Sequence, residues 1–152
     1  MEKVIVLSSK DSLAFFPGNT PARFTSVLSN PMHLEGIWSI GLQDIRMGLE
    51  GVDPKENPYM CNCVFDVHLS QINGAIANGQ ESTLLRRVYG RVGSRDRAVK
   101  QSYDTCQMMA IRVHNLDRFD IDIKPVDMDG RSFDPSVITH ATLILRKDSS
   151  LH

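Results

Sequence analysis

The sequence predicts a single all-β domain, on three observations. Apolar and polar residues alternate with a period of two along most of the chain, as on strands that bury one face. No long stretch repeats its apolar residues at the 3.6-residue spacing of an amphipathic helix. Clusters of Gly, Pro, Asn and Asp separate the alternating segments, without an internal repeat or a linker. The 152 residues therefore suit one domain, spanning residues 1–152.

The N-terminal half is predicted to form four strands, at residues 2–8, 22–28, 36–47 and 60–69. Asn30-Pro31 is expected to end the second strand in a turn. The third strand has the strongest pattern, because Trp38, Ile40 and Leu42 share one face that we expect to be central to the core. Continued without interruption, the same alternation places Asp44 on that face and Ile45 on the other. Residues 48–58 are rich in Gly, Pro and acidic residues and are expected to form a loop.

The C-terminal half is predicted to form four more strands, at residues 82–89, 105–114, 118–126 and 137–146. Residues 70–81 are expected to form a loop or a short helical turn, and residues 91–101 a polar, basic loop. Residues 127–131 predict a hairpin turn, in which Gly130 supplies the positive φ. About eight short strands without alternating helices indicate a β-sandwich or barrel, and the jelly-roll sandwich is the eight-stranded member of that set.

The net charge limits how the protein could bind nucleic acid, and the cysteine content indicates the redox state of its cellular compartment. A formal net charge of -1 excludes a positive field over the whole molecule, so any binding of nucleic acid must be local. Cys61 and Cys63 lie on the same face of one predicted strand, where they do not readily meet disulfide geometry. With Cys106 they make an odd number, which favours a reducing compartment and cysteines buried as small apolar groups.

The sequence lacks signals for export or membrane insertion. The apolar run at residues 4–7 is too short for the core of a signal peptide, and no stretch approaches the roughly 20 apolar residues of a membrane span. We therefore expect the protein to be made and assembled inside a cell.

Catalytic and metal-binding patterns are missing, so we expect a protein that is not an enzyme and has no cofactor. There is no Gly-rich phosphate loop, nucleophile elbow or convergent carboxylate pair. The histidines include no His-x-His pair, which argues against a metal-dependent cupin; they are His33, His68, His114, His140 and His152. The turn at Asp127, Asp129 and Gly130 lacks the downstream Glu of a calcium loop and is better explained as an acidic turn.

A group of six basic residues is the most informative charge feature of the sequence. Its members are Arg86, Arg87, Arg91, Arg95, Arg97 and Lys100. They could contact DNA phosphates or an acidic neighbouring subunit, or they could form a solvated loop whose like charges keep it exposed.

A second candidate site is the loop at Phe15, Phe16 and Asn19. Consecutive aromatic residues beside Pro17 are difficult to bury together in one sandwich, which suggests a contact between subunits. The alternative is that this loop folds over the sheet as an apolar plug.

Three segments, taken in order, carry a resemblance to a known family. The first contains Phe16-Pro17-Gly18-Asn19-Thr20, Leu34-Glu35-Gly36 and Trp38; the second is Leu84-Leu85-Arg86-Arg87-Val88; the third contains Phe119-Asp120-Ile121-Asp122-Ile123, Asp129-Gly130-Arg131, Phe133 and Thr142-Leu143-Ile144-Leu145-Arg146. The sequence resembles the single jelly-roll penton, or minor capsid, proteins of Polinton/Maverick-type elements, adintoviruses, adomaviruses and virophages. It departs from them at Gly18, where the family has the first Asn of a pair, and in the closing strand, which lacks an aromatic residue before Arg146.

The resemblance implies a single jelly roll that forms homopentamers at the vertices of an icosahedral double-stranded DNA virus capsid. The implied partner is a double jelly-roll major capsid protein, and the implied location is the virion, with packaged DNA reached through the basic loop. The chain is too short for the projecting domain of larger relatives. The alternative is a jelly roll that binds a ligand or glycan, such as a lectin or trimeric signalling module, domesticated from a viral gene.

Overall fold

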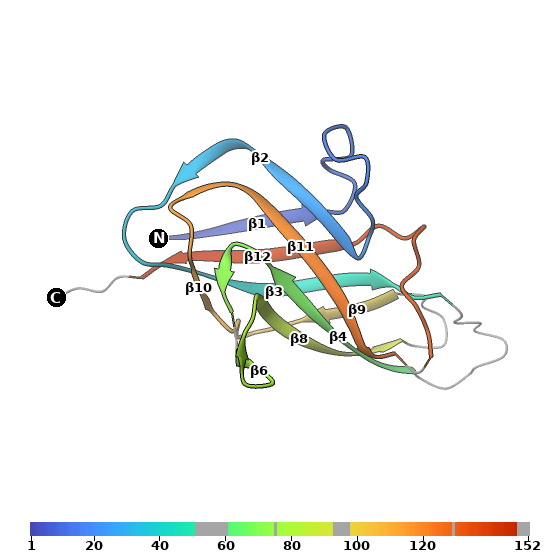
Figure 1. The fold of residues 1–152 in the computed structure, drawn as a ribbon. Coiled ribbons are helices and arrows are strands. Elements are labelled where there is room, and N and C mark those ends of the chain that lie inside the picture. Colours follow the sequence, from blue (N-terminus) through green and yellow to red (C-terminus); the bar gives the residue numbers. More distant parts are fainter. Residues whose placement is uncertain (51–60, 75, 93–97, 129, 149–152) are drawn as a thin grey trace.

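The computed structural model describes residues 1–50, 61–74, 76–92, 98–128 and 130–148 (Figure 1). Within these ranges the chain forms strands and no helix, which confirms the predicted all-β class. The strands are β1 Glu2–Ser8, β2 Arg23–His33, β3 Trp38–Gly48, β4 Cys61–Leu69, β5 Ile72–Asn73, β6 Ile76–Ala77, β7 Gln80–Glu81, β8 Leu84–Val92, β9 Ala98–Ser102, β10 Met109–Ile111, β11 Asn115–Asp127 and β12 His140–Lys147.

The long strands form two antiparallel sheets that pack face to face. Sheet A has the order β1-β12-β3-β10-β5, with β9 also paired to β3, and sheet B has the order β2-β11-β4-β8. The first long strand thus pairs with the last, the second with the last but one, and so on inward to β4 and β8. A chain folded back on itself as such a ribbon and wrapped into two sheets is a jelly roll, as the sequence predicts.

The core lies between the sheets, where the inward faces of β3, β4, β11 and β12 meet. Trp38, Ile40 and Leu42 are buried there, as the alternation predicts. On β4 the predicted face is also buried at Cys63, Phe65, Val67 and Leu69, whereas the side chain of Cys61 lies outside the described residues.

A β-bulge in β3 overturns part of the predicted alternation. Thr142 pairs with Asp44 but the next residue, Leu143, pairs with Leu42, so Gln43 is an extra residue without a partner on β12. One extra residue exchanges the faces of the strand beyond it. Ile45 and Met47 are therefore buried on the core face, and Asp44 leaves it.

The predicted turn at Asn30-Pro31 is wrong, because β2 continues to His33. Residues 28–31 bulge out opposite Asp117 alone, and regular pairing with β11 resumes at Met32. Proline is tolerated here since β2 is an edge strand and its ring can occupy a position that donates no hydrogen bond to the sheet.

The segment predicted as a basic loop at residues 91–101 contains strand β9, which pairs with β3 and buries Ala98 and Val99. The sequence pattern does not reveal this strand, because its exposed residues are polar and Val99 is its one buried residue in the described hydrophobic core. The described residues between 70 and 81, predicted as a loop or a short helical turn, form no helical turn but the two-residue strands β5, β6 and β7 with turns between them. Within the predicted strand at residues 105–114, only Met109–Ile111 is a strand.

The predicted C-terminal hairpin is a turn between sheets. Gly130 has the expected positive φ of 72°, and the Arg131 N–H donates to the Met128 carbonyl at 2.9 Å. However, β11 belongs to sheet B and β12 to sheet A, so the two strands do not pair. Local turn chemistry was predicted correctly, but it does not determine which strand is the neighbour. No helix in the described part of the chain is long and apolar enough to span a membrane.

Candidate interaction surfaces

The loop between β1 and β2 is built from successive tight turns. The Asp11 N–H donates to the Ser8 carbonyl at 3.2 Å, and the Phe16 N–H donates to the Ser12 carbonyl at 2.8 Å. The buried Ser12 hydroxyl accepts the Val27 N–H at 3.0 Å, which fastens the loop to β2. This is a structured loop, as its dense turn-forming residues predict.

The side chain of Asn19 acts as a short substitute for a neighbouring strand. Its Oδ1 accepts the Thr25 N–H at 3.0 Å, and its Nδ2 donates to the Thr25 carbonyl at 2.9 Å. Both bonds are made to one backbone unit on β2. Asn19 therefore holds the loop in place within the chain, whatever further contact it makes.

The aromatic residues of this loop have different environments. Phe16 is half-buried, whereas Phe15 is 76% exposed and Leu13 beside it is also exposed. Phe15 therefore does not cover the sheet as a plug within one chain. Its role as an inter-subunit contact stays a prediction, and a rigid loop that displays a phenylalanine suits such a contact.

The six basic residues do not lie together on one loop. Arg86, Arg87 and Arg91 lie on β8 and Lys100 lies on β9, while Arg95 and Arg97 lie outside the described residues. Arg86 stacks on Tyr103, with 3.4 Å between Cζ and the ring centroid, and donates to the Thr105 carbonyl.

On the outer face of sheet B, Arg87 binds Asp66 through two hydrogen bonds of 2.7 and 3.0 Å. This contact raises the pKa of Arg87 above its usual value. Two of the six basic side chains, those of Arg86 and Arg87, thus have partners within the chain, and Arg91 is exposed beside them. That these basic residues contact DNA phosphates or an acidic neighbouring subunit stays a prediction.

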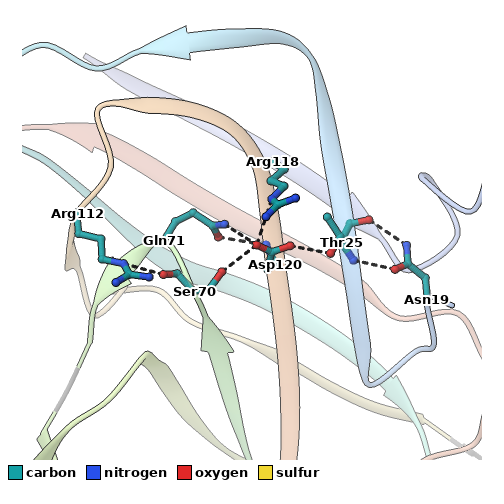
Figure 2. A network of polar contacts seen from close by, with 7 residues as sticks. All are labelled: Asn19, Thr25, Ser70, Gln71, Arg112, Arg118 and Asp120. Atoms are coloured by element: carbon teal, nitrogen blue, oxygen red, sulfur yellow. Dashed lines mark hydrogen bonds and ion pairs between the residues drawn. The ribbon is translucent and has the colours of Figure 1, made fainter. Parts of the chain in front are cut away.

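A polar network on the outer face of sheet B was not predicted from the sequence (Figure 2). It centres on Asp120 of β11. Thr25 Oγ1 donates to Asp120 Oδ1 at 2.7 Å, while Ser70 Oγ and Gln71 Nε2 donate to Oδ2 at 3.0 and 2.9 Å. The Asp120 N–H in turn donates to Gln71 Oε1 at 3.1 Å. One carboxylate thereby joins β2, β11 and the segment that follows β4.

Two arginines complete this network. Arg118 Nε lies 3.4 Å from Asp120 Oδ2, and Arg112 Nε donates to the Ser70 carbonyl at 2.9 Å. Partial burial by itself would raise the pKa of Asp120, but the hydrogen bonds from Thr25, Gln71 and Ser70 and the charge of Arg118 outweigh it and lower the pKa. Asp120 is therefore held as a carboxylate.

An open groove of about 560 Å³ runs over this network. Its lining is mostly polar and includes three cationic and two acidic side chains; the residues are Gly18, Asn19, Arg23, Phe24, Thr25, His68, Ser70, Thr83, Arg118, Asp120, Ile121, Asp122 and Lys124. His68 lies 3.1 Å from the Thr83 hydroxyl, and burial together with Lys124 lowers its pKa, which favours the neutral ring. Arg118 and Lys124 lie 3.4 and 3.9 Å from the carboxylates of Asp120 and Asp122, so hydroxyl groups are the ligand chemistry that such a lining accepts.

Among the residues that the structure describes, no three His, Cys, Asp or Glu side chains gather closely enough to hold a metal ion. The acidic turn after β11 is only partly described, since Asp129 lies outside the described residues. Asp127 is exposed at the end of β11.

Comparison with known proteins identifies a shared fold. No protein-family model and no curated protein matches the sequence. Among solved structures, the mavirus penton protein matches with a TM-score of 0.63 at 6% identity, over 97% of this chain and 100% of that chain. The infectious bursal disease virus VP2 subviral particle matches with a TM-score of only 0.27 at 7% identity, over 95% of this chain and 32% of that chain. The chain thus shares the fold of the mavirus penton protein over 97% of its own residues and all of that protein's, and the fold is a single jelly roll.

Proposed function

We propose that this protein is a structural component of a virus capsid, and specifically a penton protein whose copies form a ring of five at the vertices of an icosahedral shell. The main support for this proposal is that this chain and the mavirus penton protein match along almost their entire lengths. The mavirus penton protein is covered completely, and 97% of this chain is used in the match.

Ring formation by such a domain has a simple geometric basis. A head-to-tail contact joins one surface of a copy to a different surface of the next, and the contacts close into a ring when the rotation between copies is one-fifth of a turn. Assembly needs exposed anchor residues, and aromatic side chains are the strongest of these. Phe15, displayed on a loop that Ser12 and Asn19 hold in place, is the anchor that we propose for this contact.

The proposed partner in the shell is a double jelly-roll major capsid protein, and the proposed location is the virion. The exposed basic residues of β8, Arg91 among them, would face either that protein or the packaged DNA. The function requires no cofactor and no catalytic step.

Native mass spectrometry of the recombinant full chain tests the ring. We expect a species of five copies, either from the protein alone or after addition of the major capsid protein. A chain that remains monomeric in both conditions and never enters capsid particles would exclude the proposed function.

The groove over Asp120 supports a second candidate, a jelly roll that binds a ligand or glycan. Its volume falls in the range of ligand sites, and its hydroxyl, amide and charged groups offer hydrogen-bond donors and acceptors to the hydroxyl groups of a sugar. A glycan array would test this candidate, with Arg23→Ala as the variant, because Arg23 lines the groove without belonging to the Asp120 network. Binding that Arg23→Ala abolishes, in a protein that does not assemble, would favour this candidate over the capsid role.

A further inference from the structure

Strand β1 ends sheet A with an open edge. It pairs with β12 along its whole length, from Glu2 opposite Arg146 to Ser8 opposite His140, without a bulge. In an antiparallel edge strand, alternate residues direct their N–H and C=O groups away from the sheet. Among the described residues, no backbone hydrogen bond joins residues 3–7 to any strand or loop other than β12.

The other long edge strands have features that hinder pairing with a further strand. Strand β2 contains Pro31 and the bulge at residues 28–31, and its Val27 N–H is already bound to Ser12. Strand β8 exposes Arg87 and Arg91, and charged side chains are a common protection of sheet edges. Strand β1 has neither a proline nor a bulge, and its charged residues are confined to its first two positions.

The side chains of β1 are as favourable for pairing as its backbone. Val4 and Val6 point away from the core and are 61% and 69% exposed, while Ile5 and Leu7 point inward. At the start of the strand, Glu2 is bound to Arg146 at 2.8 and 3.0 Å. An apolar centre between polar ends is a pattern that is complementary to itself when the strand is reversed.

We propose that the open edge of β1 binds β1 of a second copy, antiparallel and centred on Ile5, so that sheet A continues from one copy into the other. In this register Val4 lies opposite Val6 of the second copy and Glu2 lies opposite Ser8. Lys3 lies opposite Leu7, so no like charges oppose each other. Two valine pairs then cover apolar side chains that are exposed in the single chain.

A whole second copy suits this edge better than an isolated peptide. A seven-residue strand is about 24 Å long and covers much less than the roughly 800 Å² per partner that stable interfaces bury. Strands β1 and β2 lie on the same side of the sandwich (Figure 1), and Lys3 Nζ reaches to 3.8 Å from Met32 Sδ on β2. A second domain placed against β1 therefore also covers part of the β2 edge.

This contact goes beyond the proposed ring and can be distinguished from it. A contact between identical strands is two-fold and joins copies in pairs, whereas the ring contact is head-to-tail and joins them in fives. Masses of two copies, or of ten when rings pair, report the β1 contact; a mass of five reports the ring alone.

The test compares two double variants of the full chain over a concentration series, by sedimentation velocity and native mass spectrometry. Val4→Lys with Val6→Lys opposes lysines across the two-fold contact and should raise the dissociation constant of pairing about tenfold or more. Val4→Glu with Val6→Lys places each Glu opposite a Lys and should restore pairing in a salt-sensitive form. Five-copy rings should be unaffected by both changes.

The matched control is Ile76→Lys, which replaces an apolar residue that is 74% exposed on β6, away from this edge. It should pair as the wild type does, and thermal unfolding verifies that all variants fold. A wild type that never forms species of two or ten copies would overturn the proposal, as would equal pairing by the double-lysine variant. A Glu–Lys variant that fails to pair would exclude the Val4–Val6 register.

Discussion

The outer face of sheet B differs from the outer face of sheet A around strand β1. On sheet B the outer side chains bind one another, as in the Asp120 network and the pair between Arg87 and Asp66. On sheet A the outer face carries an apolar patch among polar residues: Val4 and Val6 are exposed and Ile144 is buried, while Glu2 binds Arg146 on the same face. The difference indicates that the outer face of sheet B is completed by its own polar contacts, whereas the apolar patch of sheet A is completed when other residues cover it.

One part of that cover belongs to the chain itself. Gly41 lies directly opposite Ile144 on the outer face of sheet A, and a Cβ at Gly41 would lie 2.8 Å from the Gln107 carbonyl oxygen and 2.9 Å from Cys106 Cβ. Residues 106–108 therefore pack directly on the sheet at this point. Only a residue without a side chain permits so close an approach.

Replacing Gly41 by Ala should have the largest effect on stability. The new methyl group meets a backbone carbonyl, which cannot move aside as the end of a flexible side chain can, and we expect a loss of about 2 to 3 kcal/mol in the free energy of unfolding. Urea denaturation measures it. Gly18→Ala is the matched control, because nothing lies within 4 Å of its Cβ position, and it should change stability by less than about 0.5 kcal/mol. Equal losses in both variants would mean that residues 106–108 do not cover sheet A.

Replacing Asp120 by Asn tests the polar face and should cost about 2 kcal/mol at neutral pH. The loss arises because the amide nitrogen cannot accept hydrogen bonds and the charge facing Arg118 is removed. Urea denaturation again measures the change. Ser136→Ala, at an exposed residue whose hydroxyl donates to nearby Asp134, is a control expected to change little.

The same carboxylate makes stability depend on pH. Because folding lowers the pKa of Asp120, the stability that it contributes is fully present above the unfolded value near 3.9 and is lost as pH falls through the lower folded value. The stability difference between wild type and Asp120→Asn should therefore shrink on acidification below about pH 4. A difference that stays constant down to pH 2 would contradict the assignment.

The β1–β2 loop allows stability and assembly to be separated. Asn19→Ala removes two hydrogen bonds to Thr25 and should lower the free energy of unfolding by about 1 kcal/mol. Assembly should also weaken, because the loop is held less firmly.

Phe15→Ala should leave the free energy of unfolding within about 0.5 kcal/mol of the wild-type value, because the phenyl group is exposed. It should nevertheless reduce the formation of five-copy rings. Normal ring formation by Phe15→Ala would remove Phe15 from the interface.

Much of the fold was predictable because most strands bury one face regularly. The bounds of β1 and the core faces of Trp38, Ile40 and Leu42 follow from alternation alone. The errors lie where one residue changes the register, as at Gln43, or where a strand has few core residues, as in β9. Neither feature leaves a periodic signal in the sequence.

The candidate sites were predictable only in part. The exposure of Phe15 agrees with its awkward position beside Phe16 and Pro17. The Asp120 network could not be foreseen, because Ser70 and Gln71 lie about fifty residues from Asp120 in the sequence and Thr25 lies ninety-five residues away. The alternation of residues along β11 does predict that Asp120 faces outward. Its partners come together only because β2 and β4 pair with β11 in the folded sheet.

The most direct test of the capsid role is electron cryo-microscopy of particles formed when this chain is expressed with a double jelly-roll major capsid protein. If the chain is a penton protein, we expect five copies of the jelly roll around each five-fold vertex, with the β1–β2 loop of one copy at the contact with the next. Closed particles whose vertices lack this chain, or are filled by the major capsid protein itself, would contradict it.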